Sequence, residues 1–119
     1  MANQQNKGIT RIINAFGFSM LGFKAAFKHE EAFRQEVLLA LVLLPIAFYL
    51  DVTTVERVLL ILSVIFVLLV EILNSAIEAV VDRFGGEHHE LSGRAKDMGS
   101  SAVWLALVML LFTWVMIAL

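Results

Sequence analysis

The sequence is poor in several residue types, and each shortage narrows what the chain can be. It has no cysteine, which removes disulfide bonds and thiolate chemistry. Only 17% of its residues are charged and 60% are apolar, which is far outside the range of soluble domains. The net charge of −2 provides no basic field, so we expect no nucleic-acid partner. A lipid bilayer is therefore the expected environment.

Two common sequence signals are also missing. The first 36 residues contain no apolar segment followed by small residues, so no cleavable signal peptide is indicated and we expect the N-terminus to be retained. No GxxxxGK[ST] motif occurs, so any nucleotide site in this chain is not a P-loop. With 119 residues, we expect a single membrane domain over residues 1–119.

Three long apolar segments are present: VLLALVLLPIAFYL (37–50), VLLILSVIFVLLV (58–70) and SAVWLALVMLLFTWVMIAL (101–119). A helix needs roughly 20 residues to cross a hydrocarbon core of about 30 Å, so the first two segments must extend into flanking polar sequence. We predict an all-α membrane protein with three spanning helices over about residues 31–50, 55–83 and 94–119. Pro45 is acceptable in such a helix because neighbouring groups satisfy the freed carbonyl.

Basic residues are concentrated before the first apolar segment and between the second and third. They are Lys7, Arg11, Lys24, Lys28 and Arg34, then Arg83, Arg94 and Lys96. Only Arg57 lies between the first two segments, and the last segment has none. The positive-inside rule predicts a cytoplasmic N-terminus and a periplasmic C-terminus.

Residues 9–27 have a different pattern, with apolar side chains at helical spacing and polar ones between them. The apolar positions are Ile9, Ile12, Ile13, Phe16, Met20, Phe23 and Phe27. This spacing predicts an amphipathic surface helix over about residues 8–27, lying in the membrane interface. The alternative is a cytosolic helix that packs on the polar loop.

The second spanning segment ends in VEILNSAIEAVVDRF (70–84), which carries Glu71, Asn74 and Glu78 on one helical face. If the span begins near residue 55, Glu71 lies about 24 Å along it, roughly one turn inside the cytoplasmic boundary. An ionised side chain in hydrocarbon costs about 2.5–3.5 kcal/mol, so these residues indicate a functional site. Alternatively, the carboxylates pair with basic loop residues, join helices through polar contacts, or lie in water above the membrane.

A second acidic stretch, HEEAFRQE (29–36), precedes the first span on the same side of the membrane. Glu30 or Glu36 can therefore come near Glu71 and Glu78. Clustered carboxylates need a compensating cation, and oxygen ligands with phosphate suit Mg²⁺. We therefore predict a Mg²⁺–phosphate site at the membrane surface. The adjacent His88 and His89 do not predict zinc, because their imidazoles diverge and no third ligand stands at metal spacing.

Three helices alone are expected to leave Glu71 facing lipid. We therefore expect a homo-oligomer, with its sites at subunit contacts.

Nearly the whole chain resembles the small integral-membrane diacylglycerol kinases of bacteria. The resemblance lies in ITRIINAFGFSMLGFKAAF, EAFRQE, RVLLILSVIFVLLVEILNSAIEAVVDR and ELSGRAKDMGSSAV. It implies a homotrimer of three-span subunits with a surface helix, located in the bacterial inner membrane. It also implies phosphorylation of diacylglycerol to phosphatidic acid with MgATP as the phosphate donor.

The resemblance also implies roles for particular residues. Glu71 corresponds to the general base, with Asn74 beside it, and Glu30 and Glu78 correspond to the carboxylates that hold Mg²⁺ on ATP. The positions implied to contact nucleotide further include Arg11, Phe18, Glu87, His88, His89, Lys96 and Asp97. Those implied to contact the lipid substrate are Arg11, Glu36, Arg57, Glu71 and Ser100.

This sequence departs from the family pattern at His88, where we expect an aromatic hydroxyl. It also departs at Phe18 and Met20, where tyrosine and tryptophan are expected, and it ends at Leu119 without a polar tail. These departures affect the detail of the nucleotide contacts.

Other functions fit parts of the sequence. An undecaprenol kinase of the same fold would use the same site on a different lipid alcohol. A small ion or proton transporter would use Glu71 in a relay, but it would not explain the charged loop GGEHHELSGRAKD. A purely structural subunit would use the carboxylates only as polar contacts between helices.

Overall fold

The structure is a computed structural model that describes residues 7–84 and 89–119. All regular structure in these residues is helical, in the order α1 (Gly8–His29), α2 (Glu31–Tyr49), α3 (Thr54–Asp82) and α4 (Glu90–Ala118). Helices α2, α3 and α4 are each long and apolar enough to cross a membrane. The all-α class and the three helices of spanning length are therefore confirmed.

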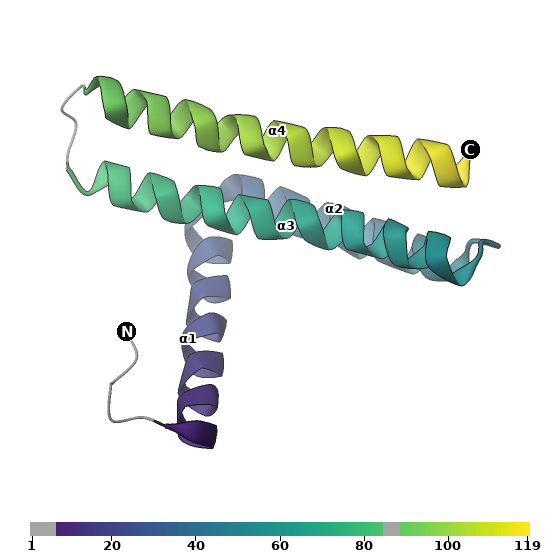
Figure 1. The fold of residues 1–119 in the computed structure, drawn as a ribbon, viewed down its shortest axis with the longest axis horizontal. Helices are drawn as coiled ribbons and strands as arrows, with labels where there is room; N and C mark the ends of the chain where they lie inside the picture. The colour runs from purple at the N-terminus through teal and green to yellow at the C-terminus, as the bar shows by residue number, and fades with distance from the viewer. Residues whose placement is uncertain (1–6, 85–88) are drawn as a thin grey trace.

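The three long helices run alongside one another, and α1 leaves this bundle across their direction (Figure 1). Helix α3 packs against both α2 and α4. Its contact with these helices includes the buried side chains Ala40 of α2, Val64 and Val67 of α3, and Ala106 and Leu110 of α4. The alanines lack bulk, which allows the helix backbones to approach closely.

One polar side-chain contact joins α3 and α4. Ser63, which interrupts the apolar run of α3, donates its hydroxyl to the Leu60 carbonyl at 2.7 Å. The Ser63 oxygen accepts a hydrogen bond from the Trp114 indole Nε1 on α4 at 3.2 Å. Both polar groups are thereby satisfied inside an apolar interface, as lipid-surrounded helices require.

Helices α2 and α3 form a tight hairpin. Thr53 caps α3 in a capping box, in which its hydroxyl accepts from the Glu56 amide at 3.2 Å and its own amide donates to the Glu56 carboxylate at 3.0 Å. Arg57 reaches back from α3 and donates to the carbonyls of Ala47 at 2.5 Å and Phe48 at 2.9 Å. Helix α2 continues through Pro45 to Tyr49, as expected for this position.

The corner between α1 and α2 is made by Glu30, whose extended backbone (φ −115°, ψ 109°) interrupts the helical path. The Arg34 guanidinium donates to the carbonyls of Phe27 at 2.8 Å and Lys28 at 3.0 Å. Carbonyls in the last turn of a helix have no amide partner within that helix, so Arg34 supplies their hydrogen bonds. These contacts tie the end of α1 to the first turn of α2.

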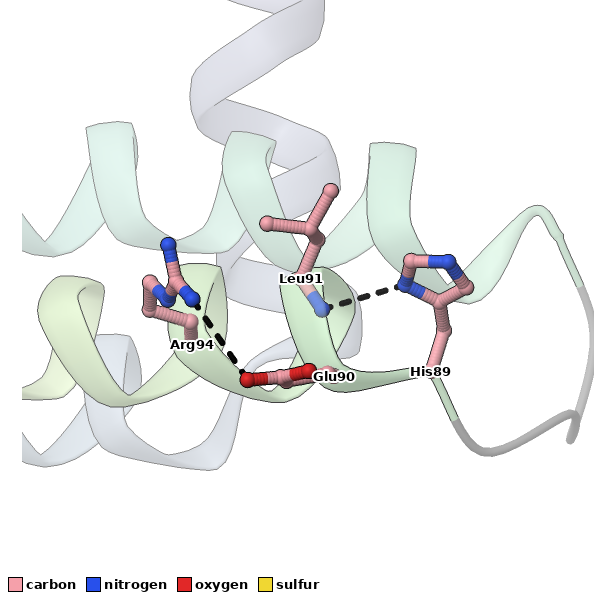
Figure 2. A network of polar contacts seen from close by, with 4 residues as sticks. All are labelled: His89, Glu90, Leu91 and Arg94. Atoms are coloured by element: carbon pink, nitrogen blue, oxygen red, sulfur yellow. Dashed lines mark hydrogen bonds and ion pairs between the residues drawn. The ribbon is translucent and has the colours of Figure 1, made fainter.

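Helix α4 begins at Glu90, before the residue 94 that the hydropathy pattern suggested. His89 caps it, because its Nδ1 accepts a hydrogen bond from the Leu91 amide at 3.0 Å (Figure 2). Glu90 and Arg94, one turn apart, form an ion pair of 3.6 Å (Figure 2). Local capping and charge pairing therefore extend the helix into polar sequence that hydropathy alone does not report.

Candidate functional site

The buried polar side chains of the described residues are Glu71, Asn74 and Ser75, all on α3. The Ser75 hydroxyl donates to Glu71 Oε2 at 3.5 Å, across one helical turn. Only 4% of Glu71 is exposed within a single chain. The expectation that a lone chain leaves Glu71 facing lipid is therefore wrong, because the other helices of the same chain cover it.

Glu36 brings a second carboxyl group to Glu71. It is half-buried on the first turns of α2, and its carboxyl lies within hydrogen-bond reach of the Glu71 carboxyl. Its Oε2 atom is buried without a hydrogen-bond partner in the structure. Two carboxyl groups in contact repel each other when both are ionised, so a proton or a cation between them would stabilise the pair.

Glu30 and Glu78 lie at the edge of this pair. Both are half-buried, and both are close enough to Glu71 for direct electrostatic interaction. The structure thus gathers four carboxyl groups, from the α1–α2 corner, α2 and α3. Within the described residues, no three acidic or histidine side chains converge closely enough to hold a metal ion alone. Such a site can offer a pair of carboxylates, with the remaining ligands supplied by a phosphate group and water.

Helix α4 contributes a basic side chain to the same end of the bundle. Lys96 forms an ion pair with Asp82 of α3 at 2.7 Å and is close enough to Glu78 to interact electrostatically. Asp97 and Ser100 lie exposed on the same helix. The sequence did not predict a role for Asp82, because its ion pair with Lys96 depends on how α3 and α4 pack together.

Some predicted site residues lie elsewhere or outside the described residues. Arg57 is 14 positions from Glu71 along α3, which is about 21 Å, and its guanidinium closes the α2–α3 hairpin. Arg11 and Phe18 are exposed on the projecting α1. His89 caps α4 through Nδ1. Glu87 and His88 lie outside the described residues.

An open groove of about 820 Å³ lies at the junction of α1 and α2. Its lining combines apolar and basic side chains: Phe23, Phe27, Phe33 and Val37, with Lys24, Lys28 and Arg34. It adjoins the turn of α2 that carries Glu36. The mixture suits a molecule with an apolar body and a polar or anionic end.

The sequence of the chain is similar to known proteins over most of its length. A family model described as prokaryotic diacylglycerol kinase matches residues 17–118. The diacylglycerol kinase of Escherichia coli strain K12 is 59% identical over 114 residues, which cover 96% of this chain and 93% of that protein. The diacylglycerol kinase of Pseudomonas aeruginosa is 55% identical over 112 residues, covering 94% and 91% respectively. That of Haemophilus influenzae is 51% identical over 107 residues, covering 90% and 91%.

A matching family model, high identity over almost the full length and three helices of spanning length lead to one conclusion. The chain belongs to the prokaryotic diacylglycerol kinase family and is an integral-membrane lipid kinase of bacterial type.

Proposed function

We propose that this enzyme transfers the γ-phosphoryl group of MgATP to the hydroxyl of diacylglycerol and produces phosphatidic acid. The observation that carries the proposal is the buried Glu71 carboxyl, which faces Glu36 and lies near Glu30 and Glu78. An ionisable group is costly in a helix surrounded by lipid, which supports a functional role for Glu71. The relatives' shared name, diacylglycerol kinase, supports diacylglycerol as the acceptor.

Glu71 acts as the general base in this proposal. Its carboxylate takes the proton of the lipid hydroxyl as that oxygen forms a bond to the γ-phosphorus. The bond from the γ-phosphorus to the bridging oxygen breaks, and ADP leaves with the electron pair. Asn74 and Ser75, buried beside Glu71, hold its carboxylate in place. Phosphoryl transfer depends mainly on such positioning and on charge stabilisation.

Glu30 and Glu78 are the proposed Mg²⁺ ligands. They are more exposed than Glu71, and both lie close enough to its carboxyl for electrostatic interaction, which fits a cation that arrives with ATP. When held there, the cation would supply positive charge that offsets the charge on the transferring phosphate. Lys96 lies near Glu78 and can approach a phosphate oxygen. The further nucleotide contacts that we propose are Arg11, Phe18, Glu87, His88, His89 and Asp97.

The lipid side of the proposed site is the groove between α1 and α2. Acyl chains would lie on Phe23, Phe27 and Phe33, while the glycerol hydroxyl reaches past Glu36 to Glu71. Ser100, Arg11 and Arg57 are proposed as further lipid contacts on the basis of the resemblance alone. Because Arg57 lies at the other end of α3, its contact would be with the distal part of the acyl chains.

We further propose that the protein is a homotrimer in the bacterial inner membrane. Its N-terminus would face the cytoplasm, its C-terminus the periplasm, and α1 would lie as an amphipathic helix in the interface. The apolar side chains exposed on α1, such as Ile9, Ile12 and Phe16, support the interfacial placement. The distribution of basic residues supports the orientation.

The second candidate is an undecaprenol kinase that uses the same carboxylates. The groove is open, and an open groove can accept lipids of different shape, including a polyprenol. A proton transporter is a third candidate, but the lysine and acidic groups gathered on α4 and α3 suit a phosphate donor better.

The test is phosphate transfer from γ-labelled MgATP by the purified protein in mixed micelles that contain diacylglycerol and undecaprenol side by side. We expect labelled phosphatidic acid. With Glu71→Gln the rate should fall about 10²–10⁴-fold, the usual contribution of a general base. Glu56→Gln is the matched control, because it makes the same change at the opposite end of α3. A dominant polyprenyl phosphate product would establish the second candidate, and labelling of neither lipid by folded protein would exclude both kinases.

A further inference from the structure

Gly99 of α4 lies directly opposite Asn74 of α3. The position that a Cβ atom would take on Gly99 is occupied by Oδ1 of Asn74, so closely that the two atoms would overlap. Gly93, on the same helix, has open space at the equivalent position. The absence of a side chain at Gly99 therefore serves a specific contact, whereas at Gly93 it does not.

The two ends of the Asn74 amide have different surroundings. The side chain is buried, with 8% of the residue exposed, and it lies within hydrogen-bond reach of the Glu71 carboxyl. Only the amide NH₂ can donate to a carboxylate, so this end faces Glu71. The Oδ1 end faces Gly99 and has no hydrogen-bond partner in the structure. Because no hydrogen bond fixes the Oδ1 end, its position depends on its close packing against Gly99.

We infer that Gly99 is a positioning residue for the transfer reaction. Because Gly99 has no side chain, the Asn74 amide oxygen fits against its backbone, and this keeps the Asn74 amide NH₂ directed at Glu71. The inference rests on the proposed function only in that Glu71 takes up the proton of the lipid hydroxyl. Gly99 itself touches neither substrate in this account. It acts through Asn74.

Adding a single methyl group at Gly99 tests this arrangement directly. The end of the Asn74 side chain can rotate more easily than two packed helices can separate, so Gly99→Ala should displace the amide and leave the fold intact. Alanine also favours a helix more than glycine does. Glu71 would lose the Asn74 donor, one of the contacts that orient its carboxyl. We expect kcat to fall about 10–100-fold, the usual effect of a misplaced catalytic group, with KM for MgATP and lipid unchanged.

The experiment compares Gly99→Ala with Gly93→Ala as the matched control, using steady-state kinetics in mixed micelles. Asn74→Ala and the double variant Asn74→Ala/Gly99→Ala complete a double-mutant cycle. We expect Gly93→Ala to match the parent enzyme. In the Asn74→Ala background, the change at Gly99 should have no further effect on kcat. An equal loss in both backgrounds would show that Gly99 does not act through Asn74 and would overturn the inference.

A second readout is independent of lipid kinase activity. The chain has four asparagines, so ¹⁵N-asparagine labelling gives few side-chain amide signals, and Asn74→Ala identifies the relevant one. That signal should move in Gly99→Ala and stay in place in Gly93→Ala. An unmoved signal, full kcat or loss of folded protein in Gly99→Ala would each overturn the positioning role. A parent protein that phosphorylates no lipid but shows the shift would overturn the proposed function alone.

Discussion

At the scale of single residues, the carboxyl groups differ in burial, and the difference suggests a division of labour. Glu71 is almost fully buried, whereas Glu30 and Glu78 are only half-buried. A buried carboxylate with amide and hydroxyl partners suits proton transfer from a lipid-borne hydroxyl. Carboxylates that water can reach suit a cation that is exchanged with each nucleotide.

This division predicts a metal-dependent defect for Glu30→Gln. Removing one of two charged ligands should weaken Mg²⁺ binding, so activity should be recovered in part at high Mg²⁺ concentration. Metal titration of kinase activity checks this. Glu31→Gln is the matched control, because Glu31 is the next residue and is exposed. Identical Mg²⁺ dependence of the two variants would remove Glu30 from the metal site.

At the scale of helices, α2 and α3 form a hairpin closed by side-chain contacts to the backbone. Arg57 donates to the Ala47 and Phe48 carbonyls at the end of α2, and the Thr53 hydroxyl accepts from the Glu56 amide in the first turn of α3. Such groups have few other partners close to a membrane boundary.

We predict that Arg57→Met lowers the free energy of unfolding by about 1.5–3 kcal/mol, because charged hydrogen bonds to the Ala47 and Phe48 carbonyls are lost. Thr53→Ala should lower it by about 1 kcal/mol through loss of the cap. Unfolding in detergent, followed by circular dichroism, measures both. If Arg57→Met is no less stable than Thr53→Ala, the hairpin does not depend on the guanidinium.

The contact between α3 and α4 makes a further prediction at this scale. Ser63→Ala and Trp114→Phe each remove one partner of the indole–hydroxyl hydrogen bond. Measured interhelical hydrogen bonds in membranes average about 0.6 kcal/mol, so the coupling energy of the double-mutant cycle should be about this size. A coupling energy indistinguishable from zero would mean that the hydrogen bond does not stabilise the pair of helices.

At the scale of the whole molecule, one chain brings Glu30, Glu36, Glu71 and Glu78 together. The proposed base and metal ligands therefore belong to the same subunit. In the proposed trimer, mixing Glu71→Gln subunits with Glu30→Gln subunits should not restore activity, because no subunit then carries both groups. Activity of the co-reconstituted mixture, compared with each variant alone, checks this. Recovery of activity in the mixture would show that carboxylates from different subunits meet in one site.

Some features followed from the sequence because they depend on local pattern. Apolar runs of known length predict spanning helices, and the spacing of Glu71, Asn74 and Glu78 predicts that they share a face of α3. The acidic stretch around Glu30 and Glu36 is expected near that face, because the start of the first span and the end of the second lie on the same side of the membrane. The metal and nucleotide chemistry of these residues stays a prediction.

Other features were decided only by the tertiary structure, because they depend on how helices distant in sequence pack together. Hydropathy cannot tell that one chain alone buries Glu71, that Arg57 closes a hairpin far from the carboxylates, or that Asp82 pairs with Lys96. It also cannot tell that one glycine of α4 faces Asn74 and another faces open space. The physical reason is that periodicity fixes which residues share a face of one helix, whereas the rotation and depth of each helix against its neighbours fix which faces meet.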